Sequence, residues 1–314
     1  MAMHRPIRVA QFGLGAIGLA TARLVKSKKS LHLVGAVDAD KSKHGKTGLG
    51  VPVFQTLGEL LQKTKAEVVL HTTGSRLATV TPQILEVVNA NLPCISSSEE
   101  LFFPIASNKP LAKKIDVAAR RNEVAVAGTG VNPGFVMDLL PIILSSTCQR
   151  IRHITIKRIV DVSTRRIQLQ RKVGVGLTAK EFDRLKGLGK MGHVGLRESA
   201  LFVANALGWK LDSIKQVLSP VSGRSTILGI HESIHGKSRG REVLTLELKM
   251  AVDVPNPRDE IMIDGDPALH MMISGGIRGD QATAAILVNT IPLVLRAEPG
   301  LRLVLELGVP RMPP

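Results

Sequence analysis

A glycine-rich turn near the start of the chain restricts its fold more than any other stretch. Residues 7–18, IRVAQFGLGAIG, place an apolar run before Gly13, Gly15 and Gly18 in the spacing G-x-G-x-x-G. An amphipathic run follows at once, so the predicted order is strand, tight turn, helix. Gly13 permits the turn, Gly15 lets a pyrophosphate approach the backbone, and Gly18 lets the helix pack closely on the strand. The predicted dinucleotide-binding turn consists of Gly13, Leu14, Gly15, Ala16, Ile17 and Gly18.

An acidic residue ends the next predicted strand, 31–37. Asp38 follows Gly18 by 20 residues, a separation at which a carboxylate accepts hydrogen bonds from the ribose hydroxyls of an adenosine. Because a 2′-phosphate would meet this carboxylate, the sequence predicts NAD or NADP as cofactor, with NAD preferred. Lys41 and Lys43 follow closely and leave the use of both cofactors open. The alternative is a structural glycine turn with a surface aspartate.

Strands and helices alternate from residue 7 to about residue 130. Apolar runs typical of buried strands occur at 66–73, 92–97 and 123–128. Helical patterns alternate with them at 57–65, 80–91 and 110–122. Such alternation indicates a parallel sheet that is covered on both faces. Together with the glycine turn after the first strand, it predicts an α/β Rossmann domain with a doubly wound parallel sheet.

The pattern changes after GTGVNPG, residues 128–134. A helix is expected at 135–146, with a kink or break at Pro141. Period-two alternation at 151–162, 243–254 and 260–263, with helices at 179–188 and 193–207 between, predicts an α+β domain with helices on one face. The apolar stretch 279–295 predicts a helix that returns to the Rossmann domain. The expected domains are therefore 1–133 with 279–314 for the dinucleotide, and 134–278 for substrate binding and dimerisation.

Composition limits the class of protein. The net charge is +16, but the basic residues are scattered and aromatic residues make up only 3%, so nucleic-acid binding is not expected. No apolar run approaches the roughly 20 residues of a membrane span, and no signal-peptide core precedes the first strand. Two cysteines do not make a disulfide framework. The sequence predicts a cytoplasmic protein, and a non-catalytic nucleotide-sensing or nucleic-acid-binding protein remains the alternative from another class.

Three motifs resemble one enzyme family. They are GTGVNPGFVMDLLP at 128–141, MGHVGLRES at 191–199 and GGIRGDQATAAILVN at 275–289. They resemble the 2,4-diaminopentanoate dehydrogenases, relatives of the native amine dehydrogenases with an architecture similar to that of dihydrodipicolinate reductases. The resemblance spans the whole chain. It implies a Rossmann domain with an inserted α+β domain, and the reversible oxidative deamination of an amine to a ketone and ammonia with NAD or NADP.

The implied reaction needs a carboxylate near the nicotinamide to hold the ammonium and take its proton. The resemblance places a catalytic glutamate in SSSEELFFP, which makes Glu99 and Glu100 the candidates. Both follow the predicted strand 92–97, at the edge where open α/β sheets bind ligands. Strand alternation would turn them to opposite faces, and Glu100 is preferred over Glu99. The structural alternative is a pair of acids that favours a helix dipole.

Further site residues are expected around this edge. Thr72, Thr73 and Gly74 end another predicted strand, where small residues let a cofactor lie across the strand ends. Asn132 is suited to hydrogen-bond the nicotinamide carboxamide, or is a turn residue before proline. His193 is expected to contact the substrate or to cap its helix.

Substrate, metal and assembly are less constrained. A substrate carboxylate would need a cation, and the unranked candidates are Arg158, Arg165, Arg197 and Arg224. No metal site is expected, because Gly229 and Gly236 argue against a helix that would bring His231 and His235 onto one face. The exposed face of the α+β sheet needs cover, which predicts a homodimer. A dihydrodipicolinate-type reductase, or another imine or carbonyl reductase, is the alternative enzyme, although the chain lacks an HHxxK-like basic cluster.

Overall fold

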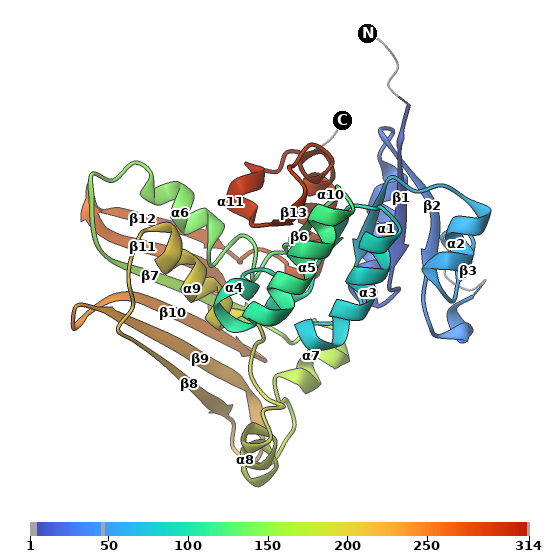
Figure 1. Cartoon of the computed structure of the whole chain (residues 1–314). Coiled ribbons are helices and arrows are strands. Elements are labelled where there is room, and N and C mark those ends of the chain that lie inside the picture. The colour runs from blue at the N-terminus through green and yellow to red at the C-terminus, as the bar shows by residue number, and fades with distance from the viewer. Residues whose placement is uncertain (1–4, 45–47, 313–314) are drawn as a thin grey trace. The chain divides into compact units, whose positions relative to one another are not determined.

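The computed structural model describes residues 5–44 and 48–312, which form two compact units (Figure 1). The first unit takes the chain as far as Gly134 and again from Arg278, and the second unit is Phe135–Ile277. Each division lies one residue from the expected position.

A seven-stranded parallel sheet forms the centre of the first unit, in the order β13-β6-β5-β4-β1-β2-β3. The strands are β1 (Ile7–Phe12), β2 (Leu31–Val37), β3 (Val53–Phe54), β4 (Val68–His71), β5 (Cys94–Ser96), β6 (Ala125–Gly128) and β13 (Gly300–Arg302). The helices are α1 (Ala16–Ser27), α2 (Leu57–Lys63), α3 (Leu77–Asn89), α4 (Pro104–Ser107), α5 (Lys109–Arg121), α10 (Gly279–Val294) and α11 (Val304–Leu307), with 3-10 turns η1 (Lys41–Lys43) and η2 (Glu99–Leu101).

Both faces of this sheet are apolar, because successive strand residues point to opposite faces and helices cover each one. Ala10 of β1 belongs to the core that includes residues of α2, α3 and α5. Its neighbour Val9 belongs to the core that includes residues of α1 and α10. The doubly wound parallel sheet is confirmed, and α10 joins it as the returning helix.

A mixed six-stranded sheet forms the second unit, in the order β12-β11-β7-β10-β9-β8, and only the β7–β10 pair is parallel. The strands are β7 (Arg150–Asp161), β8 (Ser213–Ser222), β9 (Ile227–Ser238), β10 (Arg241–Ala251), β11 (Arg258–Asp266) and β12 (Leu269–Ser274). The helices are α6 (Leu139–Ser145), α7 (Ile167–Lys172), α8 (Ala179–Gly187) and α9 (Leu196–Ala206). Helix α9 packs on β9 and β10, and α6 packs on β7.

Two features of the second unit differ from expectation. Helix α6 begins at Leu139 rather than near 135, because the Asp138 carboxylate accepts the Leu139 N–H at 2.7 Å and caps the helix there. Pro141 then lies in the first turn, where its missing N–H breaks no intrahelical hydrogen bond. Strands β8, β9 and β12 were not predicted.

Candidate functional site

The carboxyl ends of neighbouring parallel strands carry most of the predicted site. The glycine turn follows β1, Asp38 follows β2, Thr72 follows β4, Glu99 follows β5 and Asn132 follows β6. These strands are adjacent in the sheet, so the structure brings the corresponding segments to one edge. This is the edge at which open α/β sheets bind ligands.

The glycine turn has the geometry that its spacing predicts. Gly13 has a φ of +94°, and a Cβ there would lie 2.8 Å from Thr73 Cγ2. A Cβ on Gly18 would overlap the carbonyl oxygen of Gly13. The absence of a side chain at Gly18 therefore lets α1 approach the turn closely. At Gly15, which precedes α1, an added Cβ would meet no atom within 4 Å. The start of α1 is therefore open to an approaching group, and its first turn carries no acidic residue.

Three donors hold the Asp38 carboxylate. The backbone N–H of Leu14 and the Lys43 ammonium lie 2.7 Å and 2.8 Å from Oδ2, and the Asp40 N–H lies 2.9 Å from Oδ1. Burial alone would raise the pKa of Asp38, but these hydrogen bonds outweigh it and hold the pKa below its usual value. Asp38 is thus an ionised acceptor beside the glycine turn.

Thr72, which follows β4, hydrogen-bonds to the glycine turn. Thr72 Oγ1 donates to the carbonyl of Gly13 at 3.0 Å, and the buried Gln11 amide donates to Thr72 Oγ1 at 2.8 Å and to the same carbonyl at 3.0 Å. Gln11 Oε1 is buried and meets no partner among the described residues. Gln11 was missed from the sequence, although a polar residue inside an apolar strand is a signal of such a role.

His71 is a second residue that was missed. It is fully buried at the end of β4, where Nδ1 lies 2.9 Å from Ser96 Oγ and Nε2 lies 3.0 Å from Gln83 Oε1. Thr73 Oγ1 lies 2.9 Å from Nε2, so the ring fixes a threonine of the predicted site. Burial lowers the pKa of His71 to about 4, although the hydrogen bond to Gln83 opposes the shift.

The neutral state of His71 predicts acid sensitivity. Its pKa is about 4 in the folded protein, against the 6.5 of an ordinary histidine, so the unfolded chain binds more protons between these values. Stability is therefore full above pH 6.5 and falls as the pH approaches 4, by roughly 2 kcal/mol at pH 5 from this group. Denaturant unfolding at pH 7 and pH 5 measures the loss. A His71→Gln variant should be less stable at pH 7 but should lose less between the two pH values; an equal loss would contradict the prediction.

Glu99 and Glu100 lie in η2, beyond the end of β5. The expectation that strand alternation separates them is therefore wrong, because both belong to a helical turn. Glu100 Oε2 accepts the Leu77 N–H at the start of α3, and Oε1 pairs with Arg76, each at 2.7 Å. The backbone N–H of Glu100 donates to the carbonyl of Ser75 at 3.2 Å, which ties η2 to the segment after β4.

Asn132 lies in the turn after β6. Its Oδ1 is buried without a hydrogen-bond partner among the described residues. The following peptide bond to Pro133 is cis, and the N–H of Val131 donates to Thr283 Oγ1 of α10 at 3.4 Å. An acceptor of this kind suits the NH₂ of a carboxamide.

His193 belongs to the second unit, between α8 and α9. Its backbone N–H donates to the buried Glu232 at 2.7 Å, and its Nδ1 is buried with no partner among the described residues. Burial, with Lys172 and Arg158 nearby, lowers the pKa of His193 to about 3. The ring is neutral, and the helix that follows begins beyond it, at Leu196.

Arg158 is the buried member of the arginine candidates. Its Nη1 lies 3.0 Å from both carboxylate oxygens of Asp259, and its Nη2 donates to the carbonyl of Ile277 at 2.7 Å. Both side chains are nearly inaccessible. Arg158 therefore joins β7 to β11 and to the end of the second unit.

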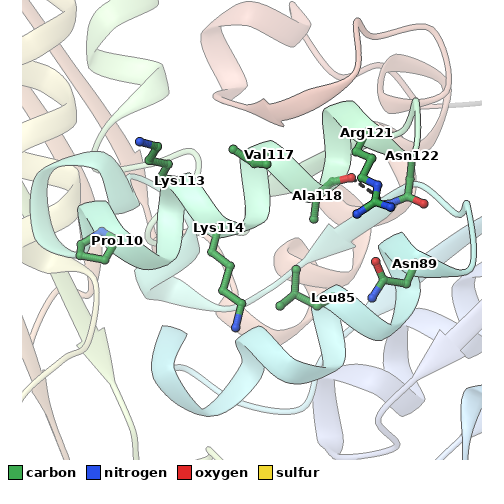
Figure 2. Close-up of a pocket in the computed structure, with 9 residues that line it drawn as sticks. All are labelled: Leu85, Asn89, Pro110, Lys113, Lys114, Val117, Ala118, Arg121 and Asn122. Carbon is green, nitrogen blue, oxygen red and sulfur yellow. Dashed lines mark hydrogen bonds between the residues drawn. The ribbon is translucent and has the colours of Figure 1, made fainter.

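A groove between α3 and α5 contains none of the predicted residues. Its volume is about 670 Å³, and Figure 2 shows Lys113, Lys114 and Arg121 along it beside Val117. Within the described part of the chain, no three His, Cys, Asp or Glu side chains form a metal-binding group.

No helix among the described residues has the length and apolar character needed to cross a membrane.

Comparison with known proteins agrees with this architecture. Residues 135–313 match the model of the 2,4-diaminopentanoate dehydrogenase C-terminal domain, and residues 4–97 match that of a CoA binding domain. A 2,4-diaminopentanoate dehydrogenase from Acetoanaerobium sticklandii is 32% identical, over 97% of this chain and 94% of that protein.

Solved structures share the fold. An amine dehydrogenase from Mycobacterium smegmatis superposes with a TM-score of 0.84 at 24% identity, covering 98% of this chain and 97% of that one. A dihydrodipicolinate reductase from a Paenisporosarcina species gives 0.58 at 14% identity, covering 96% and 99%. The family match over residues 135–313 and the identity along nearly the whole length confirm the resemblance carried by the three motifs, and the chain belongs to the 2,4-diaminopentanoate dehydrogenase family.

Proposed function

We propose that the protein is an NAD(P)-dependent amine dehydrogenase, which converts an amine reversibly to a ketone and ammonia. The observation that carries this is the sheet edge of a member of this family, where the glycine turn follows β1, the carboxylate pair follows β5, and only β4 lies between these two strands. The substrate class is a 2,4-diaminopentanoate-like or simple amine.

The residues of the edge fit a nicotinamide dinucleotide. The open start of α1 at Gly15 suits a pyrophosphate, Asp38 suits the ribose, and the orphaned Asn132 Oδ1 suits the carboxamide. Thr72, Thr73 and Gly74 lie between these groups at the end of β4. The bound nicotinamide supplies the acceptor and donor of hydride. NAD is the preferred cofactor, because the Asp38 carboxylate opposes a 2′-phosphate.

The carboxylate pair handles the amine nitrogen. Hydride can leave the substrate carbon only after the adjacent ammonium has lost a proton, because the nitrogen needs its lone pair to form the imine. Glu100, or Glu99 beside it, binds the ammonium, accepts that proton, and assists the water that attacks the imine. In the direction of amination, the same carboxylate holds ammonia against the ketone.

We assign His193 to the substrate side. Its neutral ring carries an unpartnered buried nitrogen in the second unit, and a buried polar atom without a partner is unfavourable unless a ligand supplies one.

The cytoplasm is the proposed compartment, in keeping with two free cysteines.

The test is oxidation of NADH that depends on ammonia. A panel of small ketones and keto acids, each with and without ammonium, should include at least one substrate whose turnover requires it. Reduction of unsaturated or carbonyl substrates at the same rate without ammonium would instead indicate an imine or carbonyl reductase of the dihydrodipicolinate type.

We also propose a homodimer through the sheet face of the second unit that faces away from α6 and α9. The pairing of the strands aligns one row across it: Met272, Glu260, Lys157, Glu247, Ser233 and Val217. Met272 and Val217 are 55% and 40% exposed at its ends. Between them Glu260, Lys157 and Glu247 alternate in charge, so this row does not repel a second copy as a surface of net +16 would. A two-fold contact uses the same patch on both copies.

Light scattering should therefore give twice the chain mass of 33.7 kDa at micromolar concentration. A Met272→Glu variant should shift toward the monomer, because it buries a charge in the contact. Val117→Glu is the matched control, since Val117 is 54% exposed in the first unit. A monomeric parent protein would overturn the proposal.

A further inference from the structure

The cofactor-discriminating residue Asp38 does not act alone in this structure. Its Oδ2 accepts both the Leu14 N–H and the Lys43 ammonium, at 2.7 Å and 2.8 Å. The remaining acceptor capacity lies on Oδ1, which takes only the Asp40 N–H among the contacts described. Asp38 can therefore still accept a ribose hydroxyl, but its charge is already neutralised by a neighbouring cation.

Lys43 owes this place to a short turn. Asp40 caps η1 by accepting the Ser42 N–H at 3.0 Å, which turns the chain back after β2. His44 closes the turn, with Nε2 3.1 Å from the carbonyl oxygen of Asp38. The Lys43 side chain is 34% exposed, whereas that of Asp38 is 11% exposed. The carboxylate is thus fixed, and the ammonium lies at the end of a flexible chain open to solvent.

We propose that Lys43 is the residue that lets this site accept NADP(H) as well as NAD(H). With a ribose diol present, Lys43 stays on Asp38 Oδ2 and the diol binds Oδ1. With a 2′-phosphate present, the ammonium turns from Asp38 to the phosphate. The carboxylate then keeps two of its three donors, the backbone N–H groups of Leu14 and Asp40. This inference rests on the proposed function for the presence of a dinucleotide, and it adds the residue that sets the choice between the two.

Charge explains why one lysine is sufficient to change the preference. A 2′-phosphate beside an unopposed aspartate places like charges together, and that arrangement is disfavoured. Lys43 removes the repulsion when it pairs with either group, and an ammonium is a good point-charge ligand for phosphate. Lys41 lies on the same turn but is exposed, and no contact with Asp38 is among those described. The sequence could not rank these two lysines, and the ion pair at 2.8 Å does.

The test compares Kd values for NADPH and NADH, measured on the full chain by nucleotide fluorescence without substrate. Lys43→Met keeps the apolar stem and should weaken NADPH about tenfold or more, the loss expected for one charge-assisted contact. NADH binding should stay within about threefold, or improve, because the lone pair of Asp38 Oδ2 that accepts the Lys43 ammonium becomes free for a ribose hydroxyl. Lys41→Met is the matched control and should leave the ratio of the two Kd values within about twofold. Lys43→Arg should restore NADPH binding.

Other outcomes would overturn the proposal. These are an equal effect of Lys43→Met on both cofactors, no effect on either, or the same shift in ratio with Lys41→Met. A thermal unfolding scan of each variant shows whether it is folded. If Lys43→Met does not fold, Lys43→Arg provides a variant that retains the charge. Because the readout is binding, a shifted ratio in a protein without ammonia-dependent turnover would support this inference while refuting the proposed function. A parent protein that binds neither cofactor would refute both.

Discussion

Glu100→Gln is expected to lower ammonia-dependent NADH oxidation by about 10²–10⁴-fold, the loss typical of a positioned acid–base group. Glutamine has nearly the same shape, and its carbonyl oxygen can still accept the Leu77 N–H that Glu100 holds at 2.7 Å. The start of α3 is therefore preserved, while the negative charge and the basic oxygen are lost. Turnover is the quantity that should fall.

The contact with Arg76 is compatible with this role. The pair is 2.7 Å long, and the arginine side chain is 57% exposed, so its contribution to stability is small and is screened by salt. A substrate ammonium can replace the guanidinium at Oε1 at little cost, while Leu77 continues to hold Oε2. The guanidinium shows that this oxygen already accepts a cation.

Matched variants separate catalysis from structure. NADH binding should be nearly unchanged in Glu100→Gln, since the proposed cofactor contacts lie at the glycine turn and Asp38. Glu99→Gln changes the neighbouring carboxylate in the same turn, and Arg76→Met removes the cation while keeping Glu100. If turnover falls only in Glu99→Gln, Glu99 is the acid–base group and Glu100 holds α3. If both glutamine variants stay within about threefold of the parent, far below that range, the motif is structural.

The second large effect is expected at Gly15. A Cβ there meets no atom within 4 Å, and the residue has a φ of −68° that alanine readily adopts. Gly15→Ala should therefore fold, with a melting temperature that falls by at most a few degrees because Gly15 is the N-cap of α1. The added methyl group would lie where we propose that the pyrophosphate approaches, so the Kd for NADH should rise by more than about tenfold, which corresponds to about 1.4 kcal/mol.

Two glycine variants provide the contrast. Gly18→Ala should destabilise the fold itself, because its Cβ overlaps the Gly13 carbonyl and lies 2.6 Å from Thr72 Oγ1; overpacking of this kind costs about 1–3 kcal/mol or more. Gly58→Ala adds the same methyl group in α2, where the nearest atom is 4.0 Å away, and should leave NADH binding unchanged without destabilising the fold. Unchanged NADH binding in Gly15→Ala would show that the pyrophosphate does not approach this residue.

The first unit was predictable from sequence because its signals are local. Continuous apolar strands, the glycine spacing and Asp38 each depend on neighbours close in the chain, and the structure confirms the doubly wound sheet that they predict. The second sheet was only partly predictable. Strand β9 reads ILGIHESIHGKS, in which the buried Glu232 stands where alternation calls for an apolar residue. The apolar pattern is thus interrupted in the row of the sheet where Arg158 pairs with Asp259.

The site shows the same limit. The carboxyl ends of parallel strands must share an edge, which predicts that Thr72, Glu100 and Asn132 lie along it, and the family resemblance added the expectation of a catalytic glutamate. What the sequence could not provide was the partner of each group, since Arg76 approaches Glu100 and Lys43 approaches Asp38 only after the turns have formed. His71 and Gln11 were missed because their roles depend on contacts between strands.

The order of synthesis gives the returning helix α10 a further consequence. The face of the first sheet that carries Val9, Val68 and Leu70 shares its core with α10, yet residues 135–277 are translated before that helix. At ribosomal rates this interval lasts about 7 to 30 seconds. During it α1 already covers part of this sheet face, but the part that α10 covers stays exposed until residues 279–294 have been made. The first unit can therefore complete its core only after the whole second unit has been translated.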